Sequence, residues 1–188
     1  MIFQELEISG VYLVSLEPQS DQRGFFARTF CEREFTERGL ELRIVQTNVS
    51  WNAKRGTLRG MHYQQAPSKE AKLVSCVRGK VFDAIIDLRA ESPSFARHAA
   101  VELEAPSRQA LYIPCGIAHG FQTLVDDTEM SYCMGDFFDP SLARGVRWND
   151  PAFAIPWPLD GVIISERDRS YPDFDAQQFA AREKNAST

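Results

Sequence analysis

The feature that most restricts the fold of this chain is its succession of short strand-like segments, each ended by glycine, proline or polar turn residues. The clearest are Val11–Leu16, Ala71–Val77, Val81–Leu88 and Gln109–Pro114, which are rich in β-branched and aromatic side chains. Arg78–Lys80 joins the second to the third, and we predict a hairpin turn there. Many short strands with such turns favour an all-β fold, a double-sheet jelly roll.

Helices are predicted in only two places. Glu32 to Arg38 has helical residue choice, and Gly39 supplies a C-terminal stop. A second helix begins near Asp175 and runs toward Glu183, with a frayed tail over 184–188. A chain of 188 residues that is 44% hydrophobic can fill one core, so we expect a single domain spanning residues 1–188.

The net charge of the chain is −5, which argues against a general binder of nucleic acid or membrane surfaces, because such proteins need a cationic face. No apolar run approaches the roughly 18 residues of a membrane helix. The first residues, Met1–Glu5, carry no basic leader followed by an apolar core. We therefore expect a cytoplasmic protein with no nucleic-acid or membrane partner.

Two of the three histidines lie in strand-like segments that are far apart in the sequence. His62 is in Leu58–Gln64, and His119 is in Pro114–Phe121, where glycines mark turns. A sheet enzyme gathers proton-transfer groups in this way, so the pattern indicates an acid/base site. A lone histidine in a strand is also a common structural residue, and the residues alone leave that alternative open.

Lys72 and Asp83 are charged residues within otherwise apolar strand-like segments. Because burying an ammonium group without a partner is costly, Lys72 by itself indicates function. Asp83 is the residue that we expect to pair with it.

The segments that carry these residues resemble the dTDP-4-dehydrorhamnose 3,5-epimerase family. Arg59–Gln64 and Pro114–Phe121 match its RGxHxQ-type and PxGxAHGF-type strings, in order and separation. Further matches at Asp21–Phe26, Trp148–Pro151 and Ser165–Asp168 extend the resemblance over most of the chain. The resemblance implies a cupin-like double-sheet jelly roll with one or two short helices. It also implies an epimerase, an isomerase that needs no cofactor and acts on a nucleotide-activated 4-keto-6-deoxyhexose.

The resemblance assigns the roles that this chemistry requires. Removing a proton beside a ketone needs a base, a cation or donor at the enolate oxygen, and an acid on the opposite face. The resemblance implies His62 as the base, Tyr132 as the opposed donor and Lys72 as the enolate stabiliser. Asp168 would hold His62 in one tautomer. By composition alone, Tyr132 reads as an interior aromatic.

Other positions match the family's contacts to substrate: Arg23, Arg28, Gln46, Asn48, Arg59, His119, Phe138 and Arg167. Planar guanidinium groups suit phosphate oxygens, although arginines on a solvated surface are the alternative. In the family, the segment that carries Arg23 lies against the neighbouring subunit's pocket, so the resemblance implies a homodimer.

Arg59 and His62 present a geometric difficulty. Strict alternation along a strand would send them to opposite faces. Both reach one pocket only if the strand is kinked or bulged, and Gly60 is where we expect irregular pairing.

The chain departs from the family at three positions. Arg28 and Ala143 stand where the family usually carries glutamate, and Phe138 stands where it usually has a second tyrosine. Glutamate can accept the N3 hydrogen of thymine, whereas arginine only donates. The departures leave open the nucleotide (dTDP, CDP or UDP) and whether C3, C5 or both are epimerised. A mono-epimerase and a non-catalytic sugar-nucleotide-binding cupin remain alternatives.

Metal chemistry is not predicted. The three histidines are scattered, His98 lies in a polar stretch, and the chain lacks the paired-histidine segment of metal-binding cupins. A metal-dependent cupin is therefore the weaker alternative. We expect the cysteines to be buried reduced thiols, since no CxxC spacing occurs among Cys31, Cys76, Cys115 and Cys133.

Overall fold

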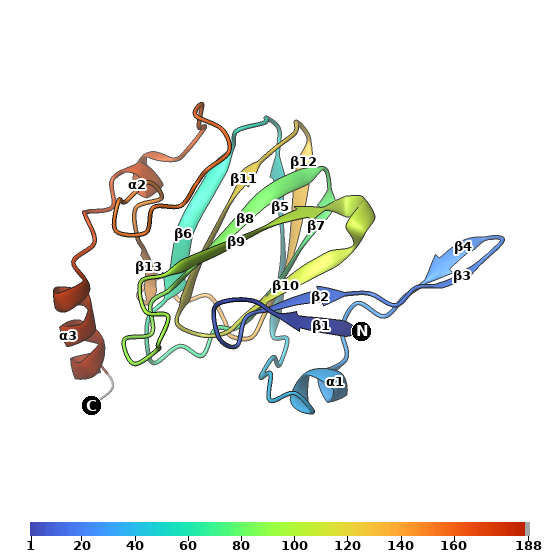
Figure 1. The fold of residues 1–188 in the computed structure, drawn as a ribbon, viewed down its shortest axis with the longest axis horizontal. Coiled ribbons are helices and arrows are strands. Elements are labelled where there is room, and N and C mark those ends of the chain that lie inside the picture. Colours follow the sequence, from blue (N-terminus) through green and yellow to red (C-terminus); the bar gives the residue numbers. More distant parts are fainter. Residues whose placement is uncertain (187–188) are drawn as a thin grey trace.

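The computed structural model describes residues 1–186 and confirms an all-β fold built on two large sheets (Figure 1). The first sheet has six strands, in the order β1 (Ile2–Glu5), β2 (Tyr12–Ser15), β10 (Gln109–Ile113), β7 (Lys72–Arg78), β12 (Thr128–Met134) and β5 (Gln46–Asn52). The second has five, in the order β13 (Ala143–Gly145), β6 (Leu58–Gln64), β11 (Ile117–Thr123), β8 (Lys80–Asp87) and β9 (His98–Glu104). Strand neighbours within both sheets are antiparallel.

Apolar side chains from both sheets fill the space between them. Val74, Leu111 and Met130 of the six-stranded sheet belong to one buried cluster with Ile85 and Phe121 of the five-stranded sheet, and none is more than 1% exposed. Burying a side chain of this kind stabilises the fold by roughly 1.5–3 kcal/mol. The apolar side chains that point inward from each sheet therefore hold the two sheets face to face, and they fix the positions of the other side chains between the sheets.

The four predicted strands are all present, but the predicted hairpin at Gly79 is wrong. β7 pairs with β10 and β12, whereas β8 pairs with β9 and β11, so the chain crosses from one sheet to the other at Gly79. Gly79 has φ of +79°, and an added Cβ would collide with Thr128, so glycine suits this turn. The sequence indicates a turn at Gly79, but it does not specify which strands pair on either side of that turn.

The helices are α1 (Glu32–Thr36), the 3₁₀ helix η1 (Ala105–Ser107), α2 (Glu166–Arg169) and α3 (Ala176–Ala186). α1 lies where a helix was predicted, although it ends two residues earlier. α3 runs three residues past the predicted end at Glu183, and the last two residues of the predicted frayed tail, 187–188, lie outside the described residues. α2 was not predicted. Within the described part of the chain, no helix is long and apolar enough to cross a membrane.

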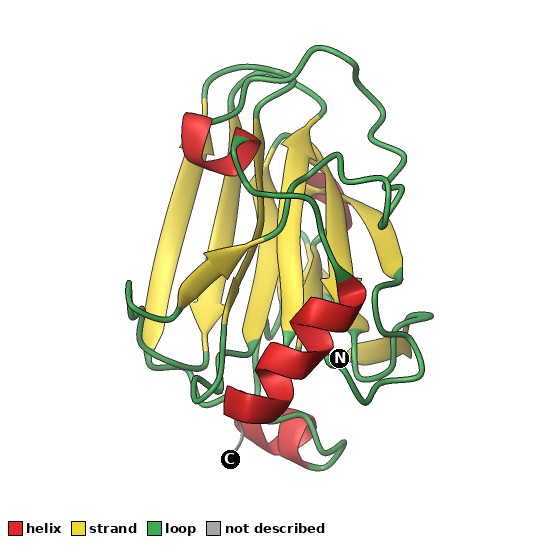
Figure 2. Cartoon of the chain, turned by 90° about the vertical axis from the view of Figure 1, so that its left-hand side faces the viewer, coloured by secondary structure: helices red, strands yellow, loops and turns green. Residues whose placement is uncertain are grey.

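The outer face of each sheet has its own cover. Phe35 of α1 packs against Phe3 and Tyr112, with ring centroids 5.1 and 5.7 Å apart, on the six-stranded sheet. Phe179 of α3 packs against Tyr63, with centroids 6.2 Å apart, on the five-stranded sheet. Figure 2 shows α3 lying across the outside of the strands. These covers leave the space between the sheets as the place for a site.

A hairpin formed by β3 (Gln19–Asp21) and β4 (Gly24–Phe26) projects from the body as an arm (Figure 1). Its aromatic side chains are unusually exposed, with Phe25 at 45% and Phe26 at 79%. The Arg108 guanidinium lies 4.2 Å from the centroid of the Phe25 ring. We call residues 19–28 the arm below.

Candidate active site

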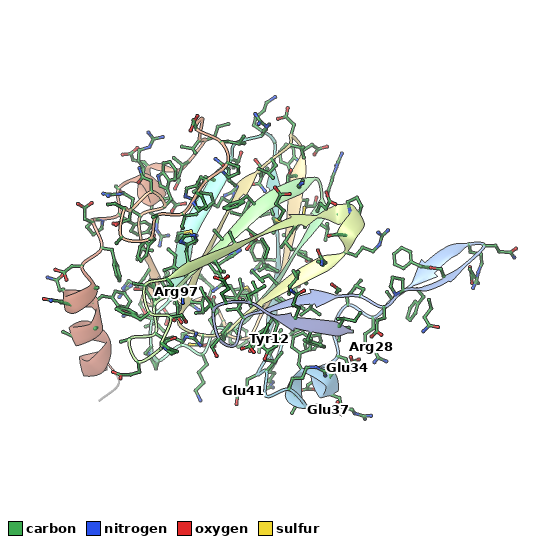
Figure 3. All side chains as sticks on the ribbon, viewed as in Figure 1. Tyr12, Arg28, Glu34, Glu37, Glu41 and Arg97 are labelled. Carbon is green, nitrogen blue, oxygen red and sulfur yellow. The ribbon has the colours of Figure 1, made fainter. Side chains whose placement is uncertain are left out.

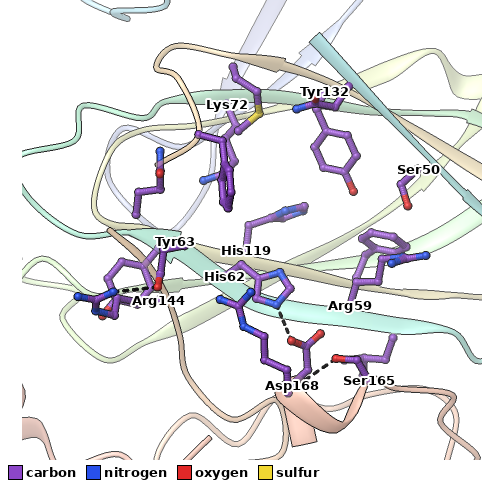
Figure 4. A pocket seen from close by; sticks show the side chains of 18 of the residues that line it. Ser50, Arg59, His62, Tyr63, Lys72, His119, Tyr132, Arg144, Ser165 and Asp168 are labelled. Carbon is purple, nitrogen blue, oxygen red and sulfur yellow. Dashed lines mark hydrogen bonds and ion pairs between the residues drawn. The ribbon is translucent and has the colours of Figure 1, made fainter. Parts of the chain in front are cut away.

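A cavity of about 760 Å³ opens between the two sheets and is lined from both. Nine of the predicted site residues line it: Asn48, Arg59, His62, Lys72, His119, Tyr132, Phe138, Arg167 and Asp168. Figure 4 shows the His62 and Tyr132 side chains on opposite sides of this space. Residues that are up to 120 positions apart in the sequence thus meet in one pocket, as the acid/base interpretation predicted.

Asp168 orients the His62 imidazole. Their Oδ1 and Nε2 atoms are 2.7 Å apart, and the Gly60 N–H donates to the other carboxylate oxygen at 3.3 Å. Asp168 sits in the first turn of α2, where its N–H donates to the Oγ of the N-cap residue Ser165 at 3.1 Å. This contact confirms the predicted pairing of Asp168 with His62, and it leaves Nδ1 as the nitrogen that can accept a proton.

The pKa of Asp168 is lowered. Burial of the carboxyl group opposes ionisation, but the His62 imidazole and the Gly60 amide outweigh burial by favouring the charged form. The carboxylate is only 5% exposed, whereas 44% of the His62 side chain is accessible. An ionised, fixed carboxylate therefore lies behind a reachable imidazole.

The irregular pairing expected at Gly60 is confirmed. His62 lies opposite His119 and Arg59 lies opposite Phe121, so β6 carries one more residue than β11 between the two pairs. Gly60 has φ of +138°, and a Cβ there would lie 2.5 Å from the Cα of Gly120. This bulge lets Arg59 and His62 line the same cavity.

His119 has its own carboxylate, and the expected pairing of Asp83 with Lys72 is wrong. Both oxygens of Asp83 lie 3.0 Å from the Nε2 atom of His119, and both residues are buried. Lys72 is paired instead with Glu70, through Nζ and Oε2. Asp83 is on β8 beside β11, where residues diagonal to each other share a face, whereas Lys72 belongs to the other sheet.

Tyr132 reaches the cavity from β12 and packs edge-on against His119, with ring centroids 6.2 Å apart. Burial raises the pKa of Tyr132, nearby Asp83 raises it further, and Arg59 opposes the shift. The hydroxyl therefore stays protonated and can donate a proton into the cavity across from His62 (Figure 4).

Two charged residues of the cavity were missed by sequence reasoning. Glu70 is 6% exposed and neutralises Lys72. Arg144 lines the cavity from β13, with its Nη1 donating to the carbonyls of Ser141 and Ala143 at 2.9 and 3.0 Å. Glu70 could have been found from its position two residues before Lys72, but no local pattern distinguishes Arg144.

Gln46 supports the cavity wall without lining it. Its Nε2 donates to the Oδ1 of Asn48 at 3.1 Å, and its Oε1 accepts from the Phe138 N–H at 3.4 Å. Phe138 and Ala143, two of the positions that depart from the family, both line the cavity.

Arg23 and Arg28 do not reach the cavity of their own chain. Arg23 is paired with Asp21 on the arm, and its side chain is 85% exposed. Arg28 donates to the Oε1 of Glu34 at 2.9 Å, beside α1 (Figure 3). The third departure from the family, Arg28, is thus engaged with a carboxylate outside the cavity.

The four cysteines are free, as predicted, but only Cys76 is fully buried; Cys115 is exposed, and Cys31 and Cys133 are half-buried. His98 contacts the Phe153 carbonyl through Nδ1 at 2.6 Å, away from the cavity. Among the described residues, no three His, Cys, Asp or Glu side chains are grouped so that they could hold a metal ion.

Comparison with known proteins identifies relatives of this chain. The family model described as dTDP-4-dehydrorhamnose 3,5-epimerase matches residues 5–176. A dTDP-4-dehydrorhamnose 3,5-epimerase of Sinorhizobium fredii is 39% identical over 173 residues, covering 92% of this chain and 89% of the relative. A dTDP-4-dehydrorhamnose 3-epimerase of Streptomyces niveus is 38% identical over 170 residues, covering 90% and 82%.

A solved structure has a similar fold. The crystal structure of the Bacillus anthracis dTDP-4-dehydrorhamnose 3,5-epimerase with TDP and PPi bound is similar to this chain, with a TM-score of 0.88 and 35% identity. The alignment covers 92% of this chain and 99% of that one.

Proposed function

We propose that this chain, which belongs to the dTDP-4-dehydrorhamnose 3,5-epimerase family, inverts C3, C5 or both of a nucleotide-diphospho-4-keto-6-deoxyhexose. The preferred substrate is dTDP-4-dehydro-6-deoxyglucose, in keeping with the names of the relatives. One observation carries the proposal: His62 and Tyr132 enter one cavity from opposite sheets. Inversion at a carbon beside a ketone needs a base on one face and an acid on the other.

In the proposed reaction, the His62 Nδ1 removes the proton from the carbon next to the 4-keto group. The electron pair of the broken C–H bond moves onto the ketone oxygen, where the Lys72 ammonium group stabilises the enolate. When the enolate collapses, the carbon takes a proton from the Tyr132 hydroxyl on the opposite face. Arg59, which favours the charged form of Tyr132, stabilises the phenolate that remains. Solvent then takes the extra proton from His62 and returns one to Tyr132, which resets the site.

The Glu70 carboxylate makes a buried Lys72 possible. Lys72 is only 8% exposed, and an unpaired ammonium at that depth would be costly. Pairing with Glu70 leaves the other N–H groups of Lys72 available to the cavity. This pair therefore supports the assignment of Lys72 to the enolate oxygen.

We assign the diphosphate to the cavity arginines. Arg59, Arg144 and Arg167 bring three guanidinium groups to its lining, and such groups bind phosphate oxygens through two parallel hydrogen bonds. Asn48 supplies an amide to the same space, and His119, held by Asp83, completes the sugar contacts.

We further propose a homodimer in which the arm of each subunit reaches the cavity of the other. Phe26 on the arm and Val49 and Trp51 on β5 are exposed by 79, 65 and 58%, and exposed apolar surface of this kind favours association. Such a dimer would deliver Arg23 and Arg28, which do not reach the cavity of their own chain. Each subunit would act as one domain spanning residues 1–188.

A reducing compartment, the cytoplasm, suits this protein, because its four cysteines are free and far apart in the sequence. Fractionation of cells that express the protein from its own promoter would test the location, and recovery outside the cytoplasm would contradict it.

A mono-epimerase is the second candidate. The relative from Streptomyces niveus carries the name of a 3-epimerase, and Phe138 lacks the hydroxyl that the family usually has there. The same alternative includes CDP- or UDP-linked substrates, because Arg28 cannot accept the N3 hydrogen of thymine. A non-catalytic binding protein is disfavoured, because it would have no need for an imidazole oriented by a carboxylate.

Incubation of the protein with dTDP-4-dehydro-6-deoxyglucose in deuterated water tests the function. Product NMR should show solvent deuterium and inverted configuration at C3, C5 or both, and inversion confined to one of these carbons would identify a mono-epimerase. Binding of the nucleotide sugar with no exchange at either carbon would contradict the proposed function.

A further inference from the structure

Gln64, the last residue of β6, binds the main chain on both sides of Phe138. Its amide is buried, with the residue only 5% exposed. Its Oε1 accepts from the Asp139 N–H at 2.7 Å, and its Nε2 donates to the Phe137 carbonyl at 3.1 Å. An amide has a donor end and an acceptor end, so these two contacts fix both the amide and the segment it holds.

The donor end of Gln64 is also tied to the ion pair of the cavity. Nε2 lies 3.2 Å from the Oε1 of Glu70, whose other carboxylate oxygen contacts Lys72. Nε2 lies 3.3 Å from the Oγ of Ser68, which in turn donates to Asp136 at 2.9 Å. The group proposed to stabilise the enolate and the loop that carries Phe138 therefore share one buried hydrogen-bond network.

Phe138 depends on its main chain for its position. The ring lines the cavity, yet the residue is 59% exposed and lies on a loop rather than in a strand. A phenylalanine has no hydroxyl with which to fix its own ring. The contacts from Gln64 to the main chain on either side of Phe138, with the longer contact from Gln46, thus hold the Phe138 ring in place at the cavity.

We propose that Gln64 is a positioning residue, which places Phe138 against the bound sugar and joins that wall to the Glu70–Lys72 pair. The inference rests on the proposed function, because it requires a sugar to occupy this part of the cavity. Its consequence is that most of the kinetic effect of losing Gln64 passes through the Phe138 ring, and a smaller part passes through the Glu70–Lys72 pair.

A double-mutant cycle on kcat/KM tests this coupling. Gln64→Met keeps the length of the side chain and removes both polar ends, and Phe138→Ala removes the ring. We expect Gln64→Met to lower kcat/KM by about tenfold in the wild-type background, and by less than about threefold when Phe138 is already alanine. An equal loss in both backgrounds would overturn the inference. Wild-type kcat/KM in Gln64→Met alone would also overturn it.

Gln122→Met is the matched control for stability. The Gln122 amide is fully buried and binds Leu159 in the same manner, with Nε2 donating to its carbonyl at 2.9 Å and Oε1 accepting from its N–H at 3.1 Å. Gln122 does not line the cavity. We expect both glutamine variants to lower Tm, but Gln122→Met to keep kcat/KM within about twofold of wild type. A loss of kcat/KM in Gln122→Met equal to that in Gln64→Met would mean a structural role only.

A binding measurement separates this inference from the proposed function. If the wild type binds dTDP-4-dehydro-6-deoxyglucose without epimerising it, the proposed function fails. The double-mutant cycle of Gln64→Met and Phe138→Ala is then measured on the calorimetric Kd for this nucleotide sugar. Non-additive Kd values would then support the role of Gln64, and additive values would contradict it. Affinity for dTDP alone should not change in Gln64→Met, because dTDP lacks the hexose that would meet Phe138.

Discussion

The two walls of the cavity hold their proton-transfer groups by different means. On the five-stranded sheet, His62 and His119 are each fixed by a carboxylate, Asp168 and Asp83 respectively. On the six-stranded sheet, Tyr132 is placed by packing and burial, with its ring against His119. The two histidines are thus held by charge and hydrogen bonds, whereas the Tyr132 hydroxyl depends on packing and burial, although Lys72 on the same wall is paired with Glu70.

In the proposed reaction, this difference suits each wall to one direction of proton transfer. An ionised carboxylate stabilises the imidazolium that forms when a base takes a proton, so the histidine wall is suited to abstraction. Burial disfavours a phenolate and keeps the Tyr132 hydroxyl protonated, so the tyrosine wall is suited to donation. The predictions below test each wall in turn.

The largest effect is expected from His62→Ala. Without the imidazole neither ring proton can leave, so we expect both epimerisation and wash-in of solvent deuterium to fall by at least about a thousandfold. NMR in deuterated water measures both rates. His98→Ala is the control, because His98 lies outside the cavity, and it should keep the wild-type rates. Exchange near the wild-type rate in His62→Ala would exclude this residue as the base.

Asp168→Asn should have a smaller effect. The amide retains an oxygen that can contact His62 but has no charge to stabilise the imidazolium, so kcat should fall by about 100-fold, the lower end of the range for proton-transfer groups. Substrate affinity, measured by calorimetry, should change little. A variant with unchanged kcat would show that the carboxylate does not assist the base.

Asp168 should also link stability to pH. Its pKa in the folded state is lowered, so its contribution to stability is present above the ordinary value of 3.8 and is lost as pH falls through the lower folded-state pKa. Urea unfolding as a function of pH should therefore show a shallower loss of stability below pH 3.8 in Asp168→Asn than in the wild type. Parallel curves would contradict the lowered pKa.

The smallest effect concerns selection of the nucleotide base. In the proposed dimer the arm of the other subunit contacts the base, so neither wall of the cavity selects it. Arg28 cannot accept the N3 hydrogen of thymine, and it is paired with Glu34. We expect calorimetric Kd values for dTDP, UDP and CDP to lie within about a hundredfold, since one unsatisfied polar group costs roughly 1–3 kcal/mol. A preference for dTDP beyond that range would end the idea of relaxed specificity.

The fold could be predicted where the signal is local. Strands such as β7 and β8 follow from residue choice, but the crossing at Gly79 depends on which strands pair, and no short segment specifies that. α2 was missed although Ser165 and Asp168 have the spacing of a helix N-terminus, a signal present in the sequence.

The identity of the site residues could be predicted from the sequence better than the side chains with which they pair. The bulge at Gly60 followed from the spacing of Arg59 and His62, because alternation is a geometric rule. The pairing of Asp83 with Lys72 was wrong, since a side chain's partner depends on the sheet to which its strand is assigned. Arg144 was missed because no local pattern distinguishes it, and its strand β13 becomes part of the site only by pairing with β6.

The central claim is that protons leave to one wall and return from the other, and Tyr132→Phe tests it most directly. In deuterated water, the rate of hydrogen exchange into recovered substrate and the rate of inverted product formation are measured together by NMR. The account predicts that product formation falls at least about tenfold more than exchange, because His62 still removes a proton and returns a deuteron to the same face. Equal losses of exchange and product would contradict the assignment of the acid to the tyrosine wall.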